Sequence, residues 1–395
     1  MLKKLLSKKS LIVIGLNSGT SSDGLDLAAV RIDLLSGKPS VKFIAGDMVS
    51  YPEKLHSLII DAINDRISSI DELIRLDRNL GRFYGDRARL FIRDLKRKGI
   101  GPDLIASHGQ TVRHIPGRVL MPQGKASGTL QLGHPETIAE QTGLMTVADF
   151  RQADIAAGGE GAPITSYAMW LLFGNRQEHR LMINIGGIAN YFFFPKGKPA
   201  DMMFAADCGP GNSLLDIISR RYLGRKYDPK GRFASKGTIS KRLLTILLAD
   251  NYLQGKYGPS TGRERFGEKF VEKIMKVSSQ LSLSKYDILA TATELTAIAV
   301  SRSITPHLEK YDISNVYLFG GGIKNEYLLS RLRVALPDVG FFSVDNLGCN
   351  PDYLEAICYA VMGAMAIHSL PAGLPKITGA RRRAIAGRIV QPSRG

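Results

Sequence analysis

The stretch LIVIGLNSGTSSDGLDLAAVRI, at residues 11–32, contains two apolar runs joined by a turn of small residues. The runs Leu11–Ser18 and Leu25–Ile32 are rich in Val, Ile and Leu, which is typical of buried β-strands. The segment between them holds Gly, Ser, Thr and Asp, the residues that favour tight turns. We therefore predict a strand, a turn and a second strand, followed by a third strand over residues 41–48.

A second region repeats this layout with different residues. The stretch LMINIGGIANYFFF, residues 181–194, again predicts two strands, now joined at Gly186-Gly187. The sequence thus predicts an α/β fold with two similar lobes, residues 1–175 and 176–395, and an active-site cleft between the lobes. The last helix, expected to begin with Asn350 as its N-cap, is predicted to pack back on the first lobe.

The composition restricts the class of protein. Hydrophobic residues make up 44% and charged residues 23% of the 395 residues, as in ordinary globular chains. The three cysteines include no CxxC pair, which argues against a disulfide scaffold or zinc ribbon and favours a reducing compartment, the cytoplasm. The sequence contains no run of about 18 apolar residues and no signal-peptide pattern, so we expect no membrane span.

The net charge of +17 is concentrated at the two ends of the chain. Residues 1–10 and 376–395 contain ten basic residues and no acidic one, and the rest of the chain carries only +7. We interpret these ends as solvated and frayed. The alternative is an arm that binds nucleic acid; it is disfavoured because no aromatic side chains are interleaved with the charges, so we predict no nucleic-acid partner.

Three glycine-containing segments are candidates for binding the phosphates of ATP. Small loops expose backbone N–H groups that surround phosphate, and helix N-termini favour anions, although each segment alone also fits an ordinary turn. The first is not a Walker A loop, because no lysine follows its glycines. The candidates are Gly19, Thr20, Ser21, Ser22, Asp23, Gly24, Leu25 and Asp26, then Asp207, Gly209, Gly211 and Asn212, then Gly320, Gly321 and Gly322.

Asp207 is also the candidate ligand of Mg²⁺. This ion takes one or two carboxylates together with phosphate oxygens, so a single carboxylate at a phosphate loop is sufficient. The alternative, of equal weight from the residues alone, is a turn or capping residue.

Asp149, Arg151 and Asp154 follow a predicted strand over residues 145–148. A carboxylate near a positively charged phosphate site stays ionised and can accept a proton, which makes this segment a candidate for general-base chemistry. The alternative is a structural Arg–Asp pair in a loop.

His108, Gln110 and Thr111 lie on a predicted loop and offer groups that suit a sugar-like ligand. A metal site at His108 and His114 is disfavoured, because their spacing is poor and a third ligand is lacking. The sequence holds no G-x-S-x-G elbow, and no G-x-G-x-x-G follows the first strand. A serine hydrolase of that type and a dinucleotide dehydrogenase are therefore unsupported.

Taken in order, these segments resemble one family, the anhydro-N-acetylmuramic acid kinases of the actin-like sugar-kinase superfamily. The resemblance runs from about Ile14 to Ala380. The matching segments are GLNSGTSSDG at 15–24, HGQT at 108–111, TLQLG at 129–133, DFRQADIAAGGEGAP at 149–163, NIGGIAN at 184–190, GPGN at 209–212, TGRE at 261–264, TELTA at 293–297, GGG at 320–322 and PDYLEA at 351–356. The chain departs from the family pattern at Asn17, Ser22 and Cys208, where Met, a bulkier apolar residue and Thr are expected.

The resemblance implies two actin-like, ribonuclease H-like lobes that bind ATP, Mg²⁺ and a 1,6-anhydro sugar. It also implies a reaction of peptidoglycan recycling, in which water attacks the anomeric carbon while O6 of the sugar is phosphorylated, giving N-acetylmuramate 6-phosphate and ADP. By position, Asp154 matches the general base of the family. The expected sugar-binding residues are His108, Gln110, Thr111, Asp149, Arg151 and Glu355.

Two alternatives remain at this point. A related class of kinases acts on levoglucosan, an anhydro sugar without the lactyl and acetamido groups, and Asn17 leaves the sugar open. A non-catalytic, ATP-binding actin-like regulator is the other alternative, with its basic ends bound to nucleic acid. The sequence does not fix the oligomeric state, and a homodimer is compatible with it.

Overall fold

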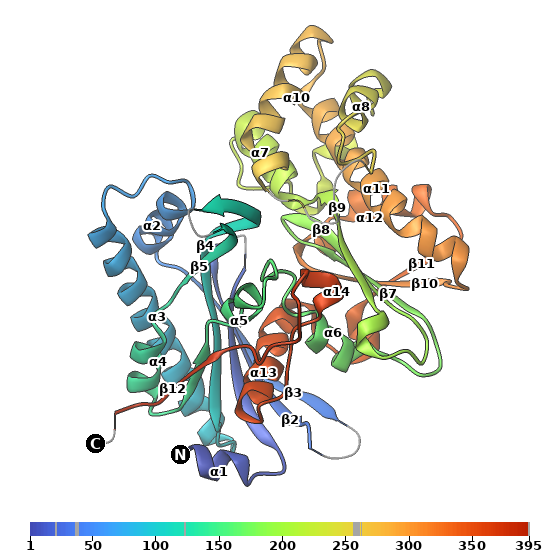
Figure 1. Ribbon diagram of the computed structural model, residues 1–395. Helices are drawn as coiled ribbons and strands as arrows, with labels where there is room; N and C mark the ends of the chain where they lie inside the picture. The colour runs from blue at the N-terminus through green and yellow to red at the C-terminus, as the bar shows by residue number, and fades with distance from the viewer. Residues whose placement is uncertain (20–21, 36–38, 122–123, 256–260, 262, 394–395) are drawn as a thin grey trace. The chain divides into compact units, whose positions relative to one another are not determined.

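The computed structural model describes residues 1–19, 22–35, 39–121, 124–255, 261 and 263–393. Backbone contacts divide the chain into two compact units (Figure 1). Unit 1 comprises Met1–Leu172 and Tyr353–Gly395, and unit 2 comprises Phe173–Asp352. Among the helices in the described ranges, none combines the length and the apolar character that a membrane crossing requires.

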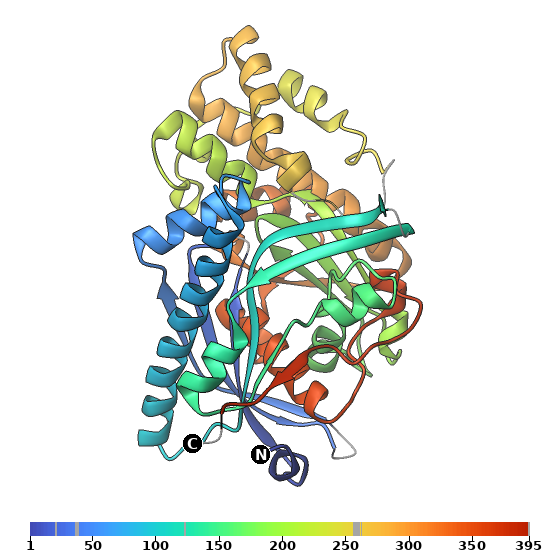
Figure 2. The same ribbon diagram turned by 60° about the vertical axis from the view of Figure 1, so that its left-hand side comes forward.

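Unit 1 contains the strands β1 (Leu11–Ser18), β2 (Gly24–Asp33), β3 (Ser40–Ser50), β4 (Leu104–Met121), β5 (Gly124–Leu132), β6 (Thr146–Ala148) and β12 (Arg388–Val390). They form one sheet in the order β12-β6-β4-β1-β2-β3, and β5 pairs with β4. β1 is buried along its whole length, because it lies in the middle of the sheet and helices cover both faces. Figure 2 shows β4 and β5 as a long two-stranded ribbon.

The helices of this region are α1 (Leu2–Leu6), α2 (Glu53–Ile63), α3 (Ile70–Arg97), α4 (Pro135–Thr142), α5 (Gln152–Ala156), α6 (Ser166–Phe173), α13 (Leu354–Ile367) and α14 (Pro375–Thr378). Ser69 caps α3, accepting a hydrogen bond from the backbone N–H of Glu72.

The sheet of unit 1 is covered on opposite faces by α3 and α13. Side chains alternate along a strand, so Ile14 and Leu16 of β1 share a core cluster with α3. Gly15, between them, faces α13. A Cβ at Gly15 would lie 1.8 Å from the carbonyl oxygen of Ala356, so only glycine allows the helix to lie this close to the strand.

Unit 2 contains the strands β7 (Arg180–Ile185), β8 (Ile188–Phe194), β9 (Phe204–Pro210), β10 (Asn315–Phe319) and β11 (Gly340–Ser343), in the order β11-β10-β7-β8-β9. Its helices are α7 (Asn212–Leu223), α8 (Lys241–Leu248), α9 (Arg263–Phe266), α10 (Glu268–Gln280), α11 (Lys285–Lys310) and α12 (Glu326–Ala335). Apolar residues of α11 and α12 pack with the sheet in a second core, and a third core joins α11 to α7, α8 and α10.

The two sheets have the same topology. The orders β3-β2-β1-β4-β6 and β9-β8-β7-β10-β11 each place the first strand of the unit in the middle. The next two strands follow it as antiparallel neighbours on one side, and the last two are parallel to it on the other. This is the ribonuclease H-like arrangement of actin-like lobes. The α/β fold and the repeated layout predicted from the sequence are therefore confirmed.

The unit boundaries differ from the predicted lobe boundaries at the C-terminal end. The second lobe was predicted to extend to residue 395, whereas Tyr353–Gly395 belongs to unit 1. The cause is the close packing of α13 on the sheet of unit 1, where a Cβ on Gly363 would lie 2.6 Å from Cβ of Ala106. This helix begins at Leu354, after a 3-10 turn, and not at Asn350 as predicted. The Asn350 side chain instead caps that turn through the N–H of Asp352.

The described residues at both ends form regular elements and are not frayed as predicted, although most of their basic side chains are exposed, as predicted. Lys8 forms an ion pair with Asp103. Near the C-terminus, the chain forms α14 and then β12, which adds to the edge of the sheet beside β6. There the Arg383 guanidinium lies 4.4 Å from the ring centre of Tyr167. Lys8 and Arg383 are thus engaged within unit 1.

Candidate active site

Asp154, the predicted general base, is fixed at both carboxylate oxygens. It lies on α5, and only 2% of its surface is exposed. The backbone N–H of Gly161 donates to Oδ2 at 2.8 Å, and the hydroxyl of Thr378 donates to Oδ1 at 2.7 Å. Each carboxylate oxygen has a second lone pair, so the group can still accept a proton while both bonds hold its orientation.

Gly159 lies directly beside this carboxylate. A Cβ at this position would lie 2.2 Å from Asp154 Oδ2. The glycine-rich run after α5 is therefore required for the chain to turn around the buried acid, which the sequence pattern alone did not reveal.

Arg151 connects the predicted base segment to β4. Its Nε donates to Nε2 of His108 at 3.1 Å, and one terminal nitrogen donates to the carbonyl of Gly161 at 3.0 Å. Burial, assisted by the Arg151 charge, holds the pKa of His108 well below its usual range, so the imidazole is neutral and accepts at Nε2. The His108 ring also stacks on Tyr359 of α13, with ring centres 4.4 Å apart.

Glu355 and Asn17 form the second polar pair of this region. Asn17, at the end of β1, donates through Nδ2 to Oε2 of Glu355 at 2.9 Å. Asn17 is buried, whereas the Glu355 side chain remains accessible to solvent. The methionine expected at residue 17 has no N–H group in its side chain and could not donate this bond.

Gln110, a predicted substrate-binding residue, forms hydrogen bonds within the protein through its amide. It is buried on β4, not in a loop as predicted. Oε1 accepts from Ser18 at 2.5 Å, and Nε2 donates to the hydroxyl of Ser22 at 3.1 Å. Tyr51 extends this network by donating to Ser18 at 2.8 Å, and Tyr84 pairs with Tyr51 at 2.7 Å. The network fixes both sides of the turn between β1 and β2.

The predicted phosphate loop at residues 19–26 is only partly a loop. Thr20 and Ser21 lie outside the described residues, and Gly24, Leu25 and Asp26 already belong to β2. Leu25 is fully buried in the core, so its side chain is not available to a ligand. Ser22 has a left-handed φ of 57° and its N–H donates to the carbonyl of Gly19 at 3.0 Å, which closes the turn. Asp23 follows it, and its carbonyl accepts from Tyr51.

Asp149 lies just after β6 in a left-handed conformation with φ of 59°. Its Oδ2 accepts from Nε of Arg388 at 2.9 Å, so it is paired with β12. The structural alternative for this segment was an Arg–Asp pair in a loop. Asp149 does form such a pair, but with Arg388 and not with Arg151, which contacts His108. Thr111, the remaining predicted sugar residue, accepts from Gln131 of β5 at 3.2 Å.

The predicted nucleotide residues of unit 2 converge at the ends of β7, β9 and β10. Three consecutive N–H groups, of Gly211, Asn212 and Ser213, donate to the carbonyls of Gly186 and Gly187 at 2.8–3.1 Å. These bonds lock the β7–β8 turn to the start of α7. They also occupy the N–H groups of Asn212 and Ser213, the first two residues of α7, so these two groups already have partners within the protein.

Gly320, Gly321 and Gly322 follow β10 in the same cluster. Gly320 has a φ of 85°, and a Cβ there would lie 2.3 Å from Oδ1 of Asn184. A Cβ on Gly321 would instead lie 3.6 Å from Nδ2 of Asn212, which is an ordinary contact. Close packing thus requires glycine at Gly320 and Gly322, whereas a side chain at Gly321 would meet only ordinary contacts.

Asp207 and Gly209 lie on β9, not in a loop as predicted. Oδ2 of Asp207 accepts from the N–H of Thr261 at 2.8 Å, which ties β9 to the segment before α9. Cys208 between them is buried in the core, so the missing hydroxyl expected there does not alter a phosphate-facing surface. Across the described ranges, no cluster of three or more His, Cys, Asp or Glu is arranged to hold a metal ion. A single carboxylate such as Asp207 still fits Mg²⁺ that also takes nucleotide oxygens.

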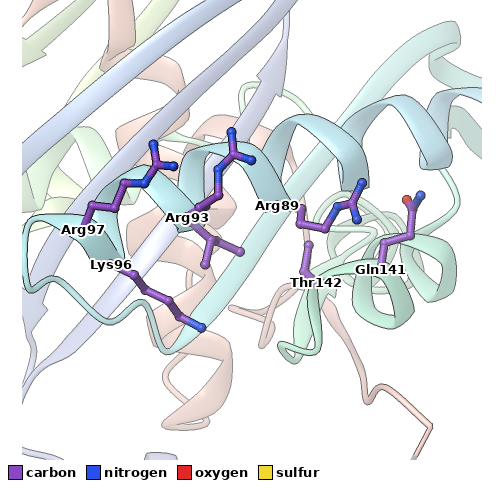
Figure 3. Close-up of a pocket in the computed structure, with 7 residues that line it drawn as sticks. Arg89, Arg93, Lys96, Arg97, Gln141 and Thr142 are labelled. Carbon is purple, nitrogen blue, oxygen red and sulfur yellow. The ribbon is translucent and has the colours of Figure 1, made fainter.

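A basic concavity of about 580 Å³ lies elsewhere in unit 1, between α3 and α4 (Figure 3). Its charged lining residues are Arg89, Arg93, Lys96 and Arg97. Arg89 and Arg97 each pair at 3.3 Å with an acidic residue of α3. None of the predicted site residues lines this concavity.

Comparison with known proteins identifies the family. The sequence model of the anhydro-N-acetylmuramic acid kinases matches residues 11–392. The chain is 35% identical over 394 residues to the anhydro-N-acetylmuramic acid kinase of Caldanaerobacter subterraneus subsp. tengcongensis, covering 98% of this chain and 99% of that one. It is 37% identical over 376 residues to the enzyme of the same name from Coxiella burnetii, covering 95% and 96%. The solved activator of 2-hydroxyisocaproyl-CoA dehydratase from Clostridium difficile, with bound ADPNP, is similar with a TM-score of 0.42 and 12% identity, covering 91% of this chain and 96% of that one.

The chain belongs to the anhydro-N-acetylmuramic acid kinase family. The resemblance drawn from the sequence motifs is thereby confirmed, and with it the class of enzyme, an ATP-using phosphotransferase.

Sequence reasoning missed three contributors to these sites. Gly186 and Gly187 were noted only as a turn, although they receive the amides of α7. Thr378 lies 224 positions after Asp154 and carries no local motif that links it to the acid.

Proposed function

We propose that the chain phosphorylates O6 of 1,6-anhydro-N-acetylmuramic acid while water opens the anhydro ring. Water adds to the anomeric carbon, the bond from this carbon to O6 breaks, and O6 takes the γ-phosphoryl group of ATP. The proton of the attacking water passes to a carboxylate. The products are N-acetylmuramate 6-phosphate and ADP.

The observation that carries this proposal is the environment of Asp154. Hydrogen bonds from Gly161 and Thr378 to its two oxygens are those of an acceptor carboxylate, and its burial keeps bulk water away. A fixed carboxylate on the face opposite the departing O6 is suited to inverting attack by water. O6 needs no acid from the protein, because the phosphoryl group takes its place.

The neighbouring groups fit the binding of a polar sugar. The neutral His108, the charged Arg151 and the accessible Glu355 offer an imidazole, a guanidinium and a carboxylate. Asp149 is the remaining candidate, and its pairing with Arg388 would have to share the carboxylate with the ligand. Gln110 contributes by shaping the turn next to this region.

Within unit 2, the glycine cluster is proposed to bind ATP. Within unit 1, the turn after β1 is proposed as a phosphate-binding segment. Mg²⁺ would be held by Asp207 and nucleotide oxygens, and would reduce the negative charge on the transferred phosphoryl group. The three cysteines are buried and none is in a disulfide, so the cytoplasm remains the expected compartment.

An assay of the purified full chain with ATP tests the proposal. ADP release and free reducing ends are measured together, with anhydro-N-acetylmuramic acid and with levoglucosan in parallel. We expect sugar-dependent ADP release and one reducing end per ADP with the muramic acid derivative. ADP without reducing ends would contradict ring opening, and faster turnover of levoglucosan would favour the alternative sugar. ATP turnover that no sugar stimulates would favour a non-catalytic regulator.

A further inference from the structure

Thr378 is a buried hydroxyl far from the predicted site in sequence, yet it contacts the predicted base. It is 2% exposed and ends α14. Its Oγ1 lies 2.7 Å from Oδ1 of Asp154 and 3.4 Å from the carbonyl of Leu374. The hydroxyl has one hydrogen, and the shorter bond to the carboxylate is the stronger.

Backbone hydrogen bonds hold this hydroxyl in place from both sides. The N–H of Glu160 donates to the carbonyl of Thr378 at 2.8 Å, and the N–H of Arg381 donates to the carbonyl of Ala157 at 2.9 Å. The C-terminal segment thus runs beside the loop that follows α5 (Figure 2). Gly379, with a φ of 76°, ends α14 and turns the chain between these two bonds.

We propose that Thr378 is a positioning residue for Asp154 in the reaction proposed above. A carboxylate held at one oxygen can rotate about its Cβ–Cγ bond, whereas donors at both oxygens fix its plane. Gly161 supplies one donor from the backbone, and Thr378 supplies the other from a side chain. The C-terminal segment therefore completes the orientation of a base located on α5. This inference rests on the proposed role of Asp154.

Thr378→Val tests the inference, because valine keeps the shape of the side chain and removes only the hydroxyl. We expect kcat for the anhydro sugar to fall about tenfold, which corresponds to ~1.4 kcal/mol of barrier. The KM for ATP should stay within about twofold, since the nucleotide residues are elsewhere. Thr378→Ser restores the donor, and kcat should return to within about threefold of the original enzyme.

Thr142→Val is the matched control in unit 1. Its hydroxyl donates to the carbonyl of Ile138 at 2.7 Å, within α4, and should be dispensable for turnover. Thermal unfolding of each variant checks that it is folded, and Thr378→Ala replaces the valine variant if that one does not fold.

Two results would overturn the inference: an unchanged kcat in Thr378→Val, or a serine variant as slow as the valine variant. A parent enzyme without turnover of the anhydro sugar would instead refute the proposed function. The two failures are therefore distinguishable.

Discussion

The two units share one strand topology but differ in what their strand ends carry. Near the ends of β1 and β6 and within β4, unit 1 places polar side chains and a carboxylate that form hydrogen bonds with one another. At the ends of β7, β9 and β10, unit 2 places glycines whose backbone groups bond across turns. One strand topology can therefore present either polar side chains or backbone N–H and C=O groups, depending on the residues that it carries.

Among the substitutions that test this difference between the units, removal of the Asp154 carboxylate in unit 1 should lower kcat the most. Asp154→Asn keeps the shape and removes the proton acceptor, so kcat with the anhydro sugar should fall about 10³-fold. Asp207→Asn, in unit 2, should mainly weaken the use of ATP and raise its KM. Steady-state kinetics with each substrate varied in turn separates the two effects.

Measurements of nucleotide binding also separate the role of Asp154 from that of Asp207. Asp154→Asn should bind a non-hydrolysable ATP analogue as the parent does. Near-parental turnover in Asp154→Asn would refute the assignment of the base, whatever Asp207→Asn shows.

A smaller effect is expected from adding one methyl group at a tightly packed glycine of each unit. Gly15→Ala places Cβ against the Ala356 carbonyl, and Gly211→Ala places it 2.4 Å from the Gly186 carbonyl. Each should lower the free energy of unfolding by about 1–3 kcal/mol, because backbone must move. Gly15→Ala should also raise the KM for the sugar, since α13 carries Glu355, whereas Gly211→Ala should raise the KM for ATP.

Gly101→Ala is the control, because a Cβ there meets no atom within 4 Å. Denaturant unfolding and substrate kinetics are measured on all three variants. If both tight glycine variants change the same KM, the division of roles between the units is contradicted.

Local sequence patterns predicted the elements of both units because strands and turns leave local signals. The apolar run over residues 11–18 and the Gly186-Gly187 turn are examples of such signals. The contacts that orient the site carry no local signal. Thr378 contacts Asp154 across 224 positions, and Arg388 contacts Asp149 across 239, so only the fold reveals these pairs.

Predicted loop residues also proved to be parts of strands for a physical reason. The polar HGQT segment was predicted as a loop, yet its polar groups find partners inside the sheet. Gln110 bonds to Ser18 and Ser22, and His108 to Arg151, so strand β4 continues through a polar stretch. The partners come from β1, from the turn after it and from the segment after β6, and propensity at one segment does not show them.

The smallest expected effect concerns pH and the two histidines of β4. Burial lowers the pKa of His108 well below its usual value, and that of His114 to about 4. The unfolded chain therefore takes up protons first as the pH falls below about 6.5, and stability should decrease from there toward the lower folded-state pKa values. The limiting slope for one proton is ~1.4 kcal/mol per pH unit.

His108→Gln removes one of the two imidazoles that take up a proton when the chain unfolds at low pH. Its free energy of unfolding should fall less steeply between pH 7 and about pH 5 than that of the parent. At pH 8 the imidazole is neutral in the folded and in the unfolded chain. Any difference in the free energy of unfolding between parent and variant at this pH therefore reports the lost stacking on Tyr359. Denaturant titrations at each pH give the two curves. Parallel curves would show that the buried imidazole of His108 does not couple folding to pH.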